Sequence, residues 1–97
     1  GVFSDQGEVD FTASDLRFTT KGNVLYVIIM GKPERELIRV ASLRQGEGLG
    51  TKEIASIDII GGAQNLDWRQ DPQQLEIVLK GRLPSEHANV LKITYRS

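Results

Sequence analysis

The sequence feature that most constrains the fold is the turn signal Gly22-Asn23, which lies between two short runs of β-forming residues. Before the turn, residues 16–20 alternate between two faces, which is the period of a half-buried β-strand. After the turn, residues 24–30 are apolar at every position. A two-residue connection that contains glycine predicts a β-hairpin, because glycine adopts positive φ angles without a steric cost. The second strand of this hairpin is therefore expected to be apolar on both faces.

Short runs of the same kind follow along the chain, separated by turn residues such as Gly61-Gly62 and Asp71-Pro72. They are residues 36–43, 54–60, 66–70, 75–79 and 91–95. About seven or eight strands at spacings of roughly 8–12 residues, with no sustained helical period, predict an all-β fold. We expect an antiparallel β-sandwich of Greek-key-like topology. Thr12 and Asp15 have capping-box spacing, but they leave room for only one short helical turn near residues 12–15.

The 97 residues are enough for one domain with a buried core. Residues 1–10 are polar and have no period, so we expect a lead-in segment or linker remnant there and a single β-sandwich over residues 11–97. The chain starts at Gly1, and its only methionine is Met30. We therefore expect a piece of a longer protein, whose function can depend on the missing part.

The charge balance argues against several kinds of partner. The chain has 12 basic and 13 acidic residues, a formal net charge of -1 and no cysteine. Phosphate binding requires a basic face and membrane-surface binding a polybasic run, and the sequence predicts neither. No stretch reaches the roughly 20 apolar residues of a membrane span. We expect no nucleic-acid partner, no membrane partner and no disulfide.

Candidate catalytic and metal-binding residues are few. His87 is the only histidine, and Ser85 and Glu86 are its close neighbours in sequence, whereas catalytic triads combine residues from distant segments. One histidine without cysteine leaves only carboxylates as metal ligands, and no aspartate spacing matches a calcium loop. We predict a structural or solvated His87, no metal and no cofactor.

Two further patterns resemble functional motifs without fitting them. The glycine-rich stretch 46–52 is not a P-loop, because Thr51 separates the last glycine from Lys52, and we expect a hairpin connection there. Asp58 and Asp67 could act as a glycosidase pair only across a cleft, but both alternate outward, so we expect solvated side chains. The sequence therefore predicts no catalytic residue in this chain.

The aromatic residues offer one candidate for sugar binding, which commonly stacks a sugar ring on an exposed aromatic side chain. Phe18, Trp68 and Tyr95 alternate in phase with aliphatic residues of their own strands and are expected in the core. Only Tyr26 remains as a possible platform. A carbohydrate-binding module is therefore kept as an alternative function.

A set of short motifs runs in order along nearly the whole chain. It starts with Phe11-Thr12-Ala13, Asp15, Arg17-Phe18-Thr19, Lys21-Gly22 and Leu25-Tyr26. It continues with Ile54, Ile57, Ile60-Gly61, Leu66, Trp68, Gln70, Leu75, Leu79 and Val90-Leu91-Lys92-Ile93. This ordered set resembles the C-terminal domain of α-L-fucosidases, glycoside hydrolase family twenty-nine. Lys32 and Lys80-Gly81 depart from the family pattern at strand ends, where they bear on local loop contacts.

The resemblance implies that the parent enzyme is a retaining exo-glycosidase that removes terminal L-fucose from glycans. Its catalytic residues are implied to lie on an N-terminal (β/α)8-like barrel, and none of them is carried over to this chain. The chain itself is implied to be a non-catalytic accessory domain that packs on the barrel and stabilises it. The parent is also implied to be exported, in the periplasm or outside the cell, or lysosomal. A protein-interaction sandwich unrelated to fucosidases is the other alternative.

The doubly apolar strand supplies a candidate surface for that packing. In a sandwich, one face of each strand meets the opposite sheet, and alternate residues point away from it. We predict that the outward residues of this strand form the interface with the catalytic barrel; they are Val24, Tyr26, Ile28 and Met30. The alternative is that loops or the lead-in segment, with Phe3 and Phe11, cover this face.

Overall fold

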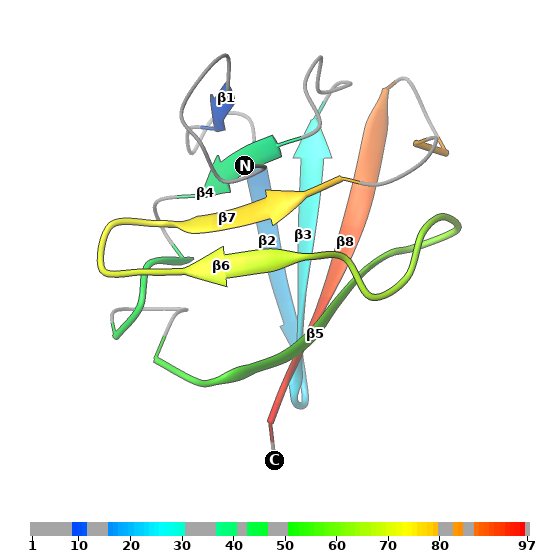
Figure 1. Cartoon of the computed structure of the whole chain (residues 1–97). Coiled ribbons are helices and arrows are strands. Elements are labelled where there is room, and N and C mark those ends of the chain that lie inside the picture. The colour runs from blue at the N-terminus through cyan, green and yellow to red at the C-terminus, as the bar shows by residue number, and fades with distance from the viewer. Residues whose placement is uncertain are drawn as a thin grey trace.

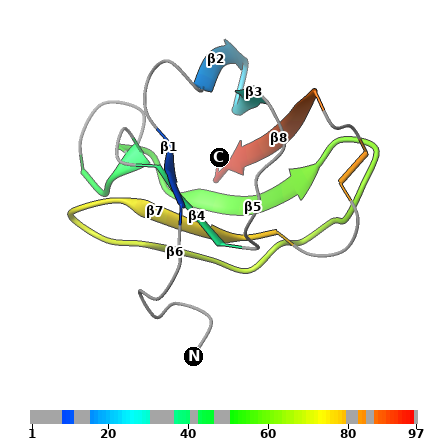
Figure 2. The ribbon, with the colours of Figure 1, turned by 90° about the horizontal axis from the view of Figure 1, so that it is seen from above.

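The computed structural model describes residues 9–11, 16–30, 37–40, 43–46, 51–79, 83–84 and 87–96. Their strands form two four-stranded sheets that lie face to face as two layers (Figures 1 and 2). Sheet A has the order β1-β4-β7-β6, with β1 (Val9–Phe11), β4 (Leu37–Val40), β7 (Leu75–Val78) and β6 (Trp68–Gln70). Sheet B has the order β2-β3-β8-β5, with β2 (Leu16–Lys21), β3 (Val24–Met30), β8 (Ala88–Tyr95) and β5 (Ile54–Ile59).

Each sheet combines one hairpin of consecutive strands, β2–β3 or β6–β7, with pairings between strands from distant parts of the chain. β8 lies between β3 and β5, and β7 lies between β4 and β6. Each described pairing is antiparallel except that of β1 with β4, which is parallel. The all-β sandwich of antiparallel strands that the sequence predicts is confirmed, and the parallel pairing of β1 with β4 is the departure from it among the described strands.

Two details at the start of the chain bear on the sequence-based expectations. Strand pairing begins at Val9, inside the segment expected as a lead-in, since β1 pairs with β4. The helical turn expected at residues 12–15 lies outside the described residues.

The described ranges contain no helix that is long and apolar enough to cross a membrane.

The core lies between the two sheets and is built from the inward-facing half of each strand. In β3, Leu25, Val27 and Ile29 are at most 1% exposed, as the alternation predicts. Burying each such side chain contributes roughly 1.5–3 kcal/mol relative to leaving it in water. The core also contains Leu16, Ile38, Val40, Leu43, Ile54, Ile57, Ile59, Leu66, Leu75, Ile77, Leu79, Leu91, Ile93 and Tyr95.

The β2–β3 hairpin forms at the predicted turn. Lys21 pairs with Val24, so the loop has two residues, and Gly22 has a φ of 60°. The side-chain amide of Asn23 donates a hydrogen bond to the carbonyl of Tyr95, and the Tyr95 N–H donates to the Asn23 carbonyl at 3.0 Å. The turn is thereby tied to the end of β8, the strand that pairs with β3 along its other edge.

β5 departs from strict alternation because it contains a β-bulge. Its register against β8 shifts between Ile54 and Ser56. Ile54 and Ile57 are consequently both buried, although an uninterrupted strand would place them on opposite faces. The sequence period locates this strand correctly but does not reveal the bulge.

The three aromatic residues expected in the core differ in their burial. Tyr95 is 6% exposed, as predicted, and this burial raises the pKa of its hydroxyl above the usual 10.0. Phe18 and Trp68 pack against the core but stay partly exposed. The difference follows from their strands, because β2 and β6 are edge strands and lack a neighbour on one side. These two residues therefore pack on the core as predicted, but they are only partly buried.

Candidate functional site

The candidate catalytic residues occupy separate elements. His87 is exposed in a bend directly before β8, whereas Ser85 and Glu86 lie outside the described residues. Asp58 is half-buried in β5, and Asp67 is exposed just before β6. Within the described part of the chain, no group of three or more His, Cys, Asp or Glu side chains could hold a metal ion.

Asp58 has a structural hydrogen bond in the connection between β5 and β6. Its Oδ1 accepts the backbone N–H of Asn65 at 2.8 Å. Asn65 has a φ of 54°, a left-handed conformation that asparagine tolerates better than most residues. The Asp58 carboxylate therefore stabilises a strained loop, and this contact accounts for one of its two oxygens.

The outer face of sheet B divides into two halves, and the first half is apolar. Register places Ile28 beside Val90 and Met30 beside Ala88. Ile60 follows β5 and donates its backbone N–H to the Val90 carbonyl at 2.9 Å, so it lies at the same end of the sheet. Met30 and Ile60 are 47% and 48% exposed. We call this group of residues from three neighbouring segments the apolar end.

The second half of this face carries a row that crosses all four strands of sheet B. Register places Thr19 of β2, Tyr26 of β3, Lys92 of β8 and Asp58 of β5 side by side. Tyr26 and Lys92 are half-buried, and Thr19 is exposed. We call this set the tyrosine row. The sequence singles out Tyr26 but not its neighbours as a group, because they come from three other strands.

The interface residues predicted from the sequence all lie on the outer side of β3. Val24, Tyr26 and Ile28 are half-buried and Met30 is exposed, in alternation with the fully buried inner residues. The structure adds that the first two border polar neighbours, whereas Ile28 and Met30 belong to the apolar end. Their role as a domain interface stays a prediction.

The outer face of sheet A carries a buried carboxylate that sequence reasoning missed. Glu76 alternates with Leu75 and Ile77 in β7, so it lies on the outer face, yet it is 1% exposed. Its register neighbours are Arg39 in β4 and Arg69 in β6. An outward glutamate in a strand is normally solvated, so the sequence contained no signal for this burial.

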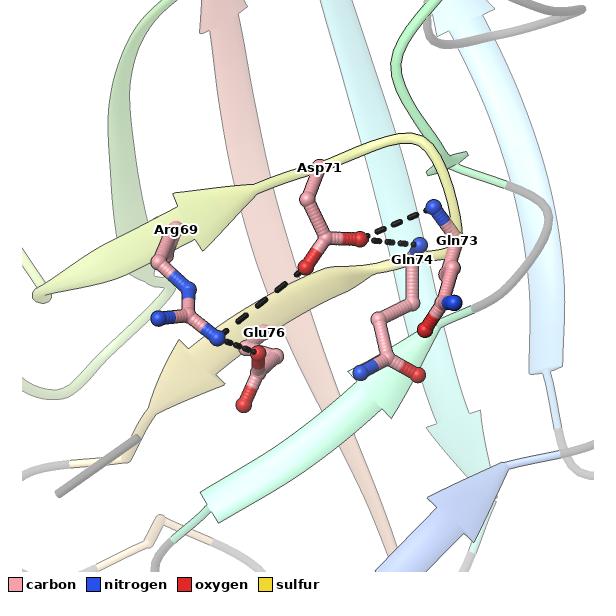
Figure 3. Close-up of polar contacts among 5 residues, drawn as sticks. All are labelled: Arg69, Asp71, Gln73, Gln74 and Glu76. Atoms are coloured by element: carbon pink, nitrogen blue, oxygen red, sulfur yellow. Dashed lines mark hydrogen bonds and ion pairs between the residues drawn. The ribbon is translucent and has the colours of Figure 1, made fainter. Parts of the chain in front are cut away.

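Arg69 and Asp71 complete a polar cluster around Glu76 (Figure 3). Arg69 Nη2 donates to Glu76 Oε1 at 2.8 Å and lies 4.0 Å from Asp71 Oδ2. Asp71 Oδ1 accepts the N–H groups of Gln73 and Gln74 at 2.8 and 3.0 Å. Glu76 Oε2 has no hydrogen-bond partner among the described residues. Through Asp71, the cluster links the turn between β6 and β7 to Arg69 in β6 and so stabilises the turn.

Comparison with known protein families decides what kind of domain this sandwich is. The family model described as alpha-L-fucosidase C-terminal domain matches residues 8–94. The chain belongs to this family. The match begins just before β1 and ends within β8, so the fucosidase domain comprises the whole sandwich. No curated protein matches the sequence.

Membership implies that the fucosidase domain has a glycosidase parent, with the catalytic domain as its partner in the same chain. Several residues that carry the resemblance lie in its core, among them Leu25, Ile57 and Leu75. The departures from the family pattern, Lys32 and Lys80-Gly81, lie outside the described residues. The resemblance therefore rests largely on the residues that build the sandwich.

Proposed function

We propose that this fucosidase C-terminal domain is a non-catalytic accessory domain that packs on the catalytic domain of its parent enzyme and stabilises it. The apolar end of sheet B is the surface that docks. In this proposal the catalytic domain removes terminal L-fucose from glycans, and the parent enzyme is exported or lysosomal.

The observation that carries the proposal is the exposure of Met30 and Ile60 at the same end of the outer face of sheet B. They are the large hydrophobic side chains that stay exposed in the described chain, at 47% and 48%, and both lie at the apolar end. Single exposed apolar residues are common, but a contiguous patch indicates an interaction surface. The partner that family membership supplies is the catalytic domain.

The energetics favour a partner in the same chain. Burying apolar area contributes roughly 25 cal/mol per Å², from which the cost of association must be subtracted. A covalently linked partner is present at a high effective concentration, so a patch of a few residues is enough to hold it. A patch of this size is small for an interface between separate molecules.

Charged substitutions at the apolar end, made in the full-length enzyme, test the proposal. Met30→Asp and Ile60→Asp should each lower the thermal midpoint of the full enzyme, because each buries a charge against the catalytic domain. The same substitutions should leave the 97-residue domain folded, since both side chains are about half exposed there. We expect a loss of about 1–3 kcal/mol in the full enzyme.

The matched control is Ala55→Asp, which places the same charge at an exposed position of β5 outside the apolar end. It should change the free energy of unfolding by less than about 0.5 kcal/mol, both in the full enzyme and in the 97-residue domain. Equal effects of all three substitutions in the full enzyme, or no effect of Met30→Asp and Ile60→Asp, would exclude docking through the apolar end.

A further inference from the structure

The tyrosine row combines an aromatic ring with charged and hydroxyl groups on the outer face of sheet B, where Thr19 is exposed and the other three side chains are half-buried. Tyr26 lies between Thr19 on β2 and Lys92 on β8, and Asp58 lies beyond Lys92 on β5. Neighbouring strands are about 4.8 Å apart, so the row spans roughly 14 Å. This length suits a chain of sugar rings better than a single small molecule.

The two charged side chains of the row, Asp58 and Lys92, do not pair with each other. Asp58 and Lys92 are register neighbours, yet no ion pair joins them among the residues that the structure describes. Asp58 instead uses one oxygen for the Asn65 N–H. The row therefore presents a cation beside Tyr26 and, one strand further on, a carboxylate oxygen.

Positive charge dominates around the ring although the whole chain has a formal net charge of -1. Arg17 pairs with Ile28 and Lys21 pairs with Val24, so both lie diagonally across from Tyr26 on the outer face. Diagonal neighbours are roughly 7–8 Å apart, within reach of long side chains. With Lys92 on the other side, three basic residues surround the ring, against the one carboxylate of Asp58.

We propose that the tyrosine row binds an acidic oligosaccharide, that is, a sugar chain that carries carboxylate or sulfate groups. The apolar face of a sugar ring stacks on Tyr26, as amphipathic aromatic side chains allow. Lys92, with Arg17 and Lys21 at the diagonal positions, binds the anionic groups through charge-assisted hydrogen bonds. Thr19 and the second oxygen of Asp58 bind sugar hydroxyls.

This inference is separable from the docking proposed above, because the tyrosine row itself lies in the other half of the outer face; Arg17, which pairs with Ile28, lies at the border with the apolar end. The apolar end lies toward Met30 and Ala88, whereas Lys21, Val24 and Thr94 lie on the far side of the tyrosine row. A failure of docking therefore leaves the sugar site in place, and a failure of sugar binding leaves the docking surface in place.

Titration of the 97-residue chain with defined oligosaccharides, followed by calorimetry and by backbone amide NMR shifts, tests the proposal. The probes are a sulfated hexasaccharide, a uronate hexasaccharide and a neutral glucose hexasaccharide of equal length. The acidic probes should bind and shift amides of β2, β3 and β8, and binding should weaken as salt is added. The neutral probe should bind at least about tenfold more weakly.

Two substitutions locate the site, and a third is the control. Tyr26→Ala should weaken binding of the acidic probes about five- to tenfold through the loss of stacking. Lys92→Gln should weaken it by a similar factor at low salt and less at high salt. Lys52→Gln removes the same charge from a side chain that lies over the Tyr95 ring, 5.8 Å from its centroid, and should change binding less than twofold.

Three results would overturn the inference. The first is no saturable binding of either acidic probe. The second is equal binding of the neutral probe, which would remove the argument from charge. The third is binding of a single-stranded oligonucleotide with the same affinity and the same sensitivity to Tyr26→Ala, which would show a general polyanion surface and not a sugar site. Thermal unfolding of each variant separates a lost site from a lost fold.

Discussion

Replacement of Arg69 by methionine tests how much this residue stabilises the buried carboxylate of Glu76. The Arg69 side chain is 55% exposed, so its removal would ordinarily be mild. Its Nη2, however, donates at 2.8 Å to a carboxylate that is 1% exposed and whose second oxygen has no hydrogen-bond partner among the described residues. Without Arg69, neither oxygen of Glu76 has a hydrogen-bond donor in the described structure.

The expected cost follows from these contacts. A hydrogen bond to a charged group contributes roughly 1.5–3 kcal/mol, and breaking a fully buried ion pair costs about 3–5 kcal/mol. The higher range does not apply, because half of Arg69 is in solvent and Arg39 remains as the other register neighbour of Glu76. We therefore expect Arg69→Met to lower the free energy of unfolding by about 2–3 kcal/mol. That is a large part of the roughly 5–15 kcal/mol typical of a small domain.

Urea unfolding of a double-mutant cycle measures this effect. In a Glu76→Gln background no buried charge is left unpaired, so Arg69→Met should cost less than about 1 kcal/mol. The coupling energy between the two positions is then about 1–2 kcal/mol. The reasoning is refuted if Arg69→Met costs less than about 0.5 kcal/mol, or if it costs the same with glutamate and with glutamine at position 76.

Three further predictions concern activity, packing and pH. The 97-residue domain should release no product from an aryl fucoside, and turnover that co-purifies with it through stringent chromatography would contradict the proposed non-catalytic role. Trp68→Ala should cost about 2–3 kcal/mol in urea unfolding, below the usual 3–5 kcal/mol for a large aromatic, because the ring is partly exposed. Tyr95 keeps its proton in the folded state to a higher pH than in the unfolded state, so stability should fall as pH rises through about 10. Tyr95→Phe should remove that part of the alkaline loss, and an unchanged pH profile would show that Tyr95 does not contribute to it.

The division of one sheet face into two halves has a consequence for the parent enzyme. The apolar end and the tyrosine row share β3, which contributes Ile28 and Met30 to one and Tyr26 to the other. A sugar chain held on the tyrosine row would lie next to the docked catalytic domain. The accessory domain would then combine stabilisation with the retention of acidic glycans beside the enzyme.

The candidate surfaces show where sequence reasoning stops. Periodicity identified β3 and assigned its inner and outer residues correctly, because alternation is a local property of an extended chain. It could not place Met30 and Ile60 at the same end of one sheet, because they are far apart in sequence and their placement depends on the pairing of β3 and β5 with opposite edges of β8. The same limit applies to Glu76, whose burial depends on what surrounds sheet A and not on its neighbours in sequence.

The sequence by itself determined the all-β class, the two-residue turn at Gly22-Asn23, the inner set of β3 and the family to which the ordered motifs belong. These features depend on side-chain period, on the φ freedom of glycine and on residues close together in the chain. Only the tertiary structure decided the parallel pairing of β1 with β4, the bulge in β5, the partial exposure of Trp68 on an edge strand and the composition of the tyrosine row. Each of these is set by which strands become neighbours, and that choice depends on the packing of the whole core, which no short segment encodes.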